Sequence, residues 1–199
     1  MSIYFRFIFI AVQVCLICLG NAAFAQKPFP YAITADTRII HAGVLLDVPG
    51  KPTKTEQTIV IRNGKIDSVQ SGYLGKQDIE GDDDNETVID LRDQFVMPGF
   101  IDLHVHISKE YGRDIKLTTV TMSDADNALS AAMYALRTLK AGFTTLRDLG
   151  SDGDSVFALR DAIKAGKIPG PRLLVAGDAI AATGGHGDVH GFRQEVLDV

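Results

Sequence analysis

Residues 98–106 constrain the fold of this 199-residue chain more than any other segment. They hold His104 and His106 at the end of an apolar, β-prone run that follows a Pro-Gly pair. Side chains alternate between the two faces of a strand, so residues two apart share a face. A strand here has one mainly polar face, formed by Phe100, Asp102, His104 and His106. Its other face is apolar and is formed by Ile101, Leu103, Val105 and Ile107. This division is typical of an α/β-barrel strand with helices packed outside and chemistry inside.

Two imidazoles side by side at the carboxyl end of a strand can bind one divalent metal ion. The alternative is a solvated histidine pair, which is the more frequent explanation of a His-x-His spacing taken alone. Metal binding is favoured here because the segment is too apolar for a solvated strand and because Pro98 and Gly99 break the chain just before it. Asp102 shares the face of the two histidines. It either contacts the metal or bonds within the barrel and orients a ligand histidine, and both roles stay open.

Residues 1–25 have the three-part order of a secretory signal peptide. Arg6 is the only charged side chain before an apolar run over residues 7–19, and an Ala-x-Ala cleavage site ends at Ala25. The run is short for a membrane span, and an uncleaved anchor helix is the alternative. Both cysteines of the chain lie inside this segment, so the mature chain needs no disulfide and has no thiolate ligand. We therefore expect an exported protein, periplasmic or secreted, with no membrane contact after cleavage.

The charge distribution argues against nucleic acid as a partner. The chain has 20 Lys and Arg against 25 Asp and Glu, a formal net charge of −5, and its basic residues do not cluster. One acidic run spans residues 80–86. A calcium loop needs alternating oxygen ligands and a later glutamate, so a solvated turn is the favoured interpretation.

Residues 26–96 are expected to form a small β-domain. Short β-prone runs alternate with turns rich in Gly, Pro and Asp. The expected strands cover residues 37–40, 43–46, 57–61, 65–69 and 88–91. Asn63 and Gly64 lie between two of these strands, and the central residues of a type I′ turn both need positive φ. This pair is the strongest hairpin signal in the chain.

From residue 97 the pattern changes to alternating strands and helices. An irregular stretch is expected from His106 through Thr121, after which Ser123 caps a helix with Asp126 at position N3 and Gly142 closes it. The apolar positions at helical spacing in this helix are Leu129, Ala132, Met133, Leu136 and Leu139, which we expect to face the core. A second strand is expected over residues 143–148 and a third over residues 172–176. Between them we expect a helix over residues 155–165, with Val156, Leu159 and Ile163 on one face.

Strands that alternate with short helices predict a parallel α/β fold. Fewer residues follow Pro98 than the roughly 200 that an α/β barrel needs. We therefore expect residues 97–199 to be the start of a TIM-type (β/α)8 barrel, namely its first three strands, in the N-terminal part of a longer protein.

Several segments occur in the order found in one superfamily of enzymes. Residues 43–47 and 61–66 are similar to its N-terminal β-sandwich. Residues 97–106 are similar to its first-strand metal motif, and residues 141–148 are similar to its second strand. Through them the mature chain resembles the metal-dependent amidohydrolase superfamily. Residues 170–174 and the Thr-Gly-Gly-His sequence at 183–186 are similar to the branch of secreted Xaa-Pro and Xaa-Arg dipeptidases and imidazolonepropionase-like enzymes. The resemblance implies that residues 26–96 are a β-sandwich that is part of a composite domain.

The resemblance also implies a barrel with one or two zinc ions, or another divalent metal, in which His104 and His106 bind the more buried ion. The family's other ligands are a carboxylated lysine on strand 4, histidines on strands 5 and 6 and an aspartate on strand 8. We expect these, and the general base, beyond Val199. Zinc lowers the pKa of bound water to near neutrality and polarises the carbonyl under attack. The implied activity is hydrolysis of carbon–nitrogen bonds by a zinc-activated hydroxide, with a dipeptide, an N-acyl amino acid or another small molecule as substrate.

Two alternatives stay open beside this activity. One keeps the fold and changes the bond, giving a cyclic amidase, a deaminase or a lactonase, because specificity in such barrels lies in the loops after the strands. The other is a truncated, catalytically inactive product. Three strands of an eight-stranded barrel leave an open edge and an uncovered core, so we expect this segment alone to be inactive and the activity to belong to the full-length protein. Whether the protein forms a homo-oligomer also stays open.

Three further residues lie at the expected carboxyl ends of the barrel strands. His186 either contacts the substrate or belongs to a flexible glycine-rich loop. Arg147 and Asp148 end the second strand, where a mutual salt bridge is favoured over a catalytic role, and Asp148 is expected to support the site.

Overall fold

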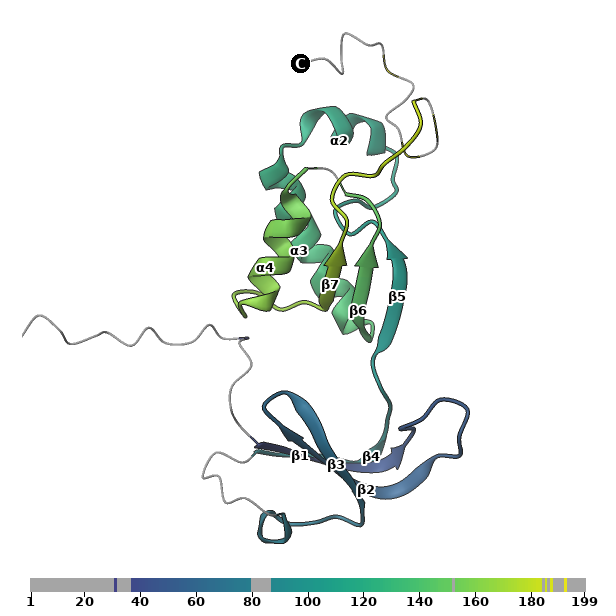
Figure 1. Ribbon diagram of the computed structural model, residues 1–199, viewed down its shortest axis with the longest axis vertical. Coiled ribbons are helices and arrows are strands. Elements are labelled where there is room, and N and C mark those ends of the chain that lie inside the picture. The colour runs from purple at the N-terminus through teal and green to yellow at the C-terminus, as the bar shows by residue number, and fades with distance from the viewer. Residues whose placement is uncertain are drawn as a thin grey trace, which may run out of the picture.

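The computed structural model describes residues 31, 37–79, 87–151, 153–183, 185, 187 and 192. The predicted signal peptide and the acidic run at 80–86 lie outside these residues. The described residues form two sheets joined by residues 97–99 (Figure 1). In chain order the elements are β1 (Thr37–Leu45), β2 (Lys54–Arg62), β3 (Lys65–Ser71), the 3-10 helix η1 (Lys76–Asp78), β4 (Thr87–Val96), β5 (Phe100–Val105), α2 (Ile115–Thr121), α3 (Asp124–Lys140), β6 (Phe143–Asp148), α4 (Ser155–Lys164) and β7 (Arg172–Val175).

The first sheet has the strand order β3-β2-β1-β4. Strand β1 is antiparallel to β2 and parallel to β4, and it merges the two strands predicted over residues 37–40 and 43–46. The hairpin between β2 and β3 is confirmed, because Arg62 pairs with Lys65 and the two turn residues, Asn63 and Gly64, have φ angles of 50° and 71°.

Small apolar clusters stabilise this first sheet. One contains Ile39, Val60 and Ile79, and another contains Ala42, Leu45 and Ile59. Strand residues whose side chains alternate between two faces can form one such cluster on each face. The described residues form one sheet here, so the second layer that a β-sandwich requires stays a prediction.

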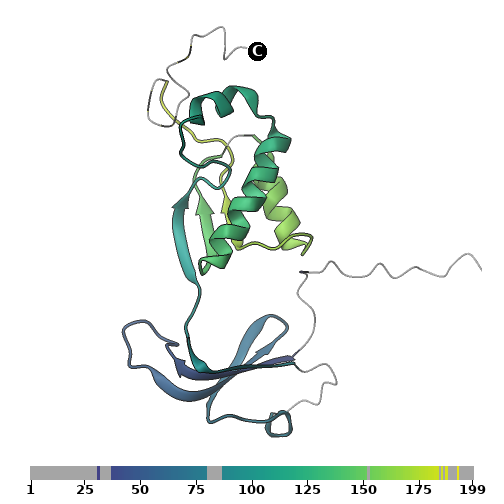
Figure 2. The same cartoon turned by 180° about the vertical axis from the view of Figure 1, so that it is seen from behind.

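The second sheet is parallel, with the order β5-β6-β7, as the alternation of strands and helices predicts. Helices α3 and α4 cover one face of it, α3 against β6 and α4 against β7 (Figures 1 and 2). The buried core between sheet and helices consists of Ile107, Ala131, Ala135, Leu146, Val156, Leu159 and Leu173. The structure is a mixed α/β fold, and closure into an eight-stranded barrel stays a prediction.

The start of α3 is confirmed and its buried face is not. Ser123 is the N-cap, and its side chain and that of Asp126 bond each other's backbone N–H in a capping box. Leu129 and Met133, expected in the core, are 75% and 51% exposed. The buried face instead carries small residues, including Ala131, because a short side chain lets the helix approach α4 and β6 closely.

The irregular stretch predicted after His106 is wrong, and the helical cover predicted for β5 is present only in part. The stretch after His106 contains helix α2, in which three threonine hydroxyls donate to carbonyls one turn back, two of them to that of Ile115, so these polar groups have partners within the helix. The apolar face of β5 is only partly covered. Ile101 and Leu103 are 62% and 58% exposed, because β5 is an edge strand of the described sheet and the helices pack on β6 and β7.

No helix among the described residues is long and apolar enough to cross a membrane.

Candidate metal centre

His104 and His106 lie side by side at the carboxyl end of β5, as the alternation of side chains predicts. His104 is in the strand and His106 directly follows it, and both are exposed. Their ring centres are 5.5 Å apart and the ring planes meet at 72°. The centre of an imidazole lies roughly 3 Å from a zinc ion bound to its nitrogen, so two rings that share one ion have centres about 5–6 Å apart. The pair therefore has the spacing that a shared ion needs.

The imidazole of His106 is oriented by a backbone carbonyl. Its Nδ1 lies 2.5 Å from the carbonyl oxygen of Gly150, in the loop after β6. A carbonyl oxygen only accepts, so Nδ1 carries the hydrogen and donates it. In the neutral ring Nε2 then keeps its lone pair for another partner, and this division of the two nitrogens is typical of metal-bound histidine.

Asp102 bonds the backbone next to the pair. Its Oδ1 accepts the N–H of His104 at 3.0 Å, and the side chain is half-buried. This contact favours the second of the two roles that the sequence leaves open, bonding within the sheet beside a ligand histidine, over direct metal contact.

Arg147 and Asp148 have separate partners, so the predicted salt bridge between them is wrong. Neighbouring residues on a strand point to opposite faces. Arg147 is exposed and donates from Nε to the carbonyl of Leu103 at 2.8 Å. Asp148 is only 1% exposed and accepts from Ile107 N, Gly150 N and Ser151 Oγ at 2.7, 3.1 and 2.7 Å.

The described residues bring no third side-chain ligand to this pair. No group of three or more His, Cys, Asp or Glu side chains converges among them. The predicted substrate contact His186 lies outside the described residues. Two imidazoles at one strand end, of which that of His106 is oriented by a carbonyl, fit a divalent ion such as zinc, and catalytic zinc sites use three protein ligands. A catalytic zinc site built on this pair would therefore need at least one ligand from outside the described residues.

The contribution of Gly150 is not visible in the sequence patterns. Its carbonyl, not a side chain, contacts His106, and backbone groups carry no residue-type signal. The available hint is the glycine itself, placed just after a strand that ends in Asp148. Any Cβ at this position would lie 2.7 Å from the Cβ of Ala179, so only glycine fits without movement.

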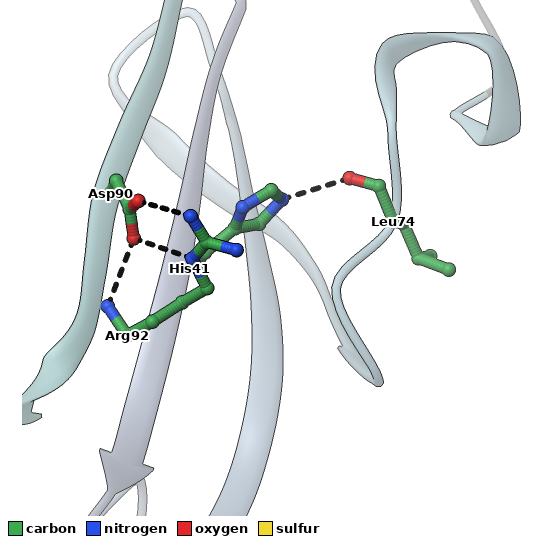
Figure 3. Close-up of polar contacts among 4 residues, drawn as sticks. All are labelled: His41, Leu74, Asp90 and Arg92. Atoms are coloured by element: carbon green, nitrogen blue, oxygen red, sulfur yellow. Dashed lines mark hydrogen bonds and ion pairs between the residues drawn. The ribbon is translucent and has the colours of Figure 1, made fainter.

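A second histidine, His41 on β1, provides a comparison in the first sheet. Its Nε2 lies 2.9 Å from the carbonyl oxygen of Leu74, and its register partner on β4 is Asp90 (Figure 3). Hydrogen bonds from the Arg92 side chain, 2.6 and 2.9 Å long, and from its backbone N–H lower the pKa of Asp90 to about 2. This carboxylate is therefore already paired with a cation.

Comparison with known proteins assigns the chain to a family. The model of the amidohydrolase family matches residues 95–198, more than half of the chain, and includes both histidines of the pair. The chain belongs to the amidohydrolase family. Ochratoxinase of Aspergillus niger is 28% identical over 168 residues, which are 82% of this chain and 33% of that protein. A dihydroorotase of Anaeromyxobacter sp. (strain K) is 36% identical over 87 residues, which are 44% of this chain and 18% of that protein.

Solved structures of the family share the fold of the amidohydrolase chain. A Xaa-Pro dipeptidase with methionine in its active site is 37% identical with a TM-score of 0.69, over 80% of this chain and 38% of that one. A prolidase complexed with N-methylphosphonate-L-proline is 31% identical with a TM-score of 0.61, over 76% of this chain and 34% of that one. The chain thus spans about a third of the length of these relatives.

Proposed function

We propose that the protein is a metal-dependent hydrolase of amide bonds in dipeptides and N-acyl amino acids. The observation that carries the proposal is the imidazole pair: His104 and His106 share one strand end, and the Gly150 carbonyl holds His106 with Nε2 available. Membership of the amidohydrolase family supports the class of reaction, and the similarity to a Xaa-Pro dipeptidase and a prolidase supports the class of substrate.

The residues present have defined tasks in such a reaction. His104 and His106 hold the ion through their free nitrogens, and Asp102 fixes the backbone of His104. When bound, a divalent ion, for which we propose zinc, supplies a water of lowered pKa and polarises the substrate carbonyl. The positions follow the general rule that parallel α/β folds place chemistry at the carboxyl ends of their strands.

The proposal also includes the compartment in which the protein acts. The apolar run and the Ala-x-Ala site of residues 1–25 support export to the periplasm or the exterior, with removal of the segment. In that compartment the substrate would be a small peptide from the surroundings, and nucleic acid and membrane are not partners.

Chelation and restoration test the activity. The full-length protein is purified, stripped of metal, supplied with Zn²⁺, Mn²⁺ or Co²⁺, and assayed on a panel of Xaa-Pro and Xaa-Arg dipeptides and N-acyl amino acids. We expect hydrolysis that chelation removes and metal restores, and that His106→Ala removes permanently while His41→Ala does not. Hydrolysis that survives both chelation and His106→Ala contradicts the proposal.

The similarity to the dihydroorotase supports a second candidate, a cyclic amidase that uses the same metal pair. The same panel, extended with cyclic amides, separates the two. Turnover confined to the cyclic compounds would replace the dipeptidase assignment and leave the roles of His104 and His106 unchanged.

A further inference from the structure

Asp148 is a buried carboxylate that no step of the proposed reaction uses. It ends β6 and is 1% exposed. Its Oδ2 accepts from the N–H of Ile107 and the hydroxyl of Ser151, both at 2.7 Å, and its Oδ1 accepts from the N–H of Gly150 at 3.1 Å. A charge removed from water needs such donors, so these three bonds account for its burial and fix the donors in return.

Two of the three donors belong to the residue after His106 and to the residue whose carbonyl bonds its ring. Ile107 directly follows His106 in the chain, and Gly150 carries the carbonyl that accepts from His106 Nδ1. The backbone after the imidazole and the acceptor of its N–H therefore both depend on one carboxylate. We propose that Asp148 is a positioning residue of the metal site, which sets the tautomer and the orientation of His106 through Gly150. This inference rests on the proposed role of His106 as a metal ligand.

The loop after β6 is anchored by other bonds as well, so loss of one contact with Asp148 need not unfold it. Leu149 N donates to Val105 O at 3.1 Å, and Ser151 N donates to Gly177 O at 2.9 Å. Gly150 lies between these two anchors. Release of its N–H from Asp148 would thus free the Leu149–Gly150 peptide unit, which joins the unit that bears the Gly150 carbonyl at the Cα of Gly150, while both ends of the loop stay in place.

An asparagine at position 148 keeps the hydrogen bonds that Oδ2 accepts and removes the one that Oδ1 accepts. With its amide oxygen in place of Oδ2, it still accepts from Ile107 N and Ser151 Oγ. Its NH2 group then replaces Oδ1 and faces the N–H of Gly150, and two donors cannot bond each other. Asp148→Asn therefore releases Gly150 and nearly preserves the volume of the side chain.

The test measures His106 directly and metal affinity separately. In metal-free protein, ¹⁵N chemical shifts of the imidazole nitrogens report which nitrogen carries the hydrogen. We expect protonated Nδ1 in the wild type and a mixture of tautomers in Asp148→Asn. Co²⁺ titration, followed by visible absorption, should show a Kd roughly 10–100-fold larger in Asp148→Asn than in the wild type. This is the usual loss of metal affinity when an outer partner of a metal-bound histidine is removed.

A matched control and a milder variant keep the test decisive. Asp178 lies in the loop after β7, and its Oδ1 accepts the N–H of Gly153 at 2.8 Å, so Asp178→Asn also removes a carboxylate that bonds a loop N–H. It should change neither readout. Should Asp148→Asn fail to fold, Ser151→Ala removes one bond to Asp148 and should shift both readouts in the same direction by a smaller amount.

The outcomes separate this inference from the proposed function. An unchanged tautomer of His106 in folded Asp148→Asn, or in Ser151→Ala if the former does not fold, overturns the positioning role. A wild-type protein that binds no Co²⁺ overturns the proposed metal site, whereas the tautomer measurement still decides whether Asp148 sets the ring of His106.

Discussion

His41 in the first sheet and His106 in the second are held in similar ways and have different surroundings. Each ring bonds a backbone carbonyl, His41 that of Leu74 and His106 that of Gly150. Beside His106 lies a second imidazole at 5.5 Å, whereas beside His41 lie the ring of Tyr73 at 5.4 Å and a carboxylate paired with Arg92. A bond to a carbonyl therefore does not by itself distinguish the two histidines, and the second imidazole is what makes His106 the candidate metal ligand.

The largest effect expected from this comparison is the loss of metal on removal of either imidazole of the pair. His104→Ala or His106→Ala should weaken Zn²⁺ binding by more than about 100-fold, beyond the 10–100-fold typical of outer partners, since a ligand itself is lost. His41→Ala should leave the affinity unchanged. Competition with a zinc-binding dye measures all three. Equal Zn²⁺ affinity in the wild type, His104→Ala and His106→Ala would show that the imidazole pair does not bind the metal, and would contradict the distinction drawn between His106 and His41.

The next effect concerns stability of the first sheet. A Cβ at Gly43 of β1 would collide with the carbonyl of Arg92 on β4, at the point where the register of the two strands shifts. Gly43→Ala should lower the free energy of unfolding by about 1–3 kcal/mol. Chemical denaturation measures this value, and metal affinity of the folded protein should not change.

Gly112→Ala is the matched control for that variant, because a Cβ at Gly112 meets nothing within 4 Å. Its effect should stay within about 0.5 kcal/mol. A loss of metal affinity in Gly43→Ala would show that the first sheet contributes to the metal centre.

The smallest effect is the pH dependence of the stability that the exposed pair of Asp90 and Arg92, beside His41, gives to the fold. The pKa of Asp90 falls from 3.8 to about 2, mainly through the hydrogen bond from the Arg92 side chain. A lowered pKa in the folded state gives stability that is present above the unfolded value and is lost as pH falls through the folded value. The difference in unfolding free energy between wild type and Asp90→Asn should be small, because both side chains are about half exposed.

Denaturation at several pH values checks the sign of that effect. The difference should shrink between about pH 4 and pH 2, where Asp90 of the wild type becomes neutral. A difference that stays constant over this range would show that the pair with Arg92 does not stabilise the fold.

Features with local causes could be predicted from the sequence. The Asn63-Gly64 turn requires two positive φ angles, and the capping box of Ser123 and Asp126 needs only two suitable residues three positions apart. The alternation that puts His104 and His106 on one face is local as well. These features are confirmed by the structure.

Features that depend on packing between elements could not be predicted. The buried face of α3 is set by close approach to its neighbours, which favours Ala131 over the more apolar Leu129. The role of Gly150 depends on a carbonyl 44 residues from His106, and the burial of Asp148 depends on three donors brought by two loops. Sequence periodicity contains none of these distances.

Anomalous diffraction at the zinc edge, from crystals of the protein grown with Zn²⁺, tests the central claim most directly. The account predicts an anomalous peak about 2.0–2.1 Å from Nε2 of His106 and at the same distance from a ring nitrogen of His104, with Nδ1 of His106 still bonded to Gly150. A peak bound to neither ring, or no peak in protein that retains this fold, would contradict it.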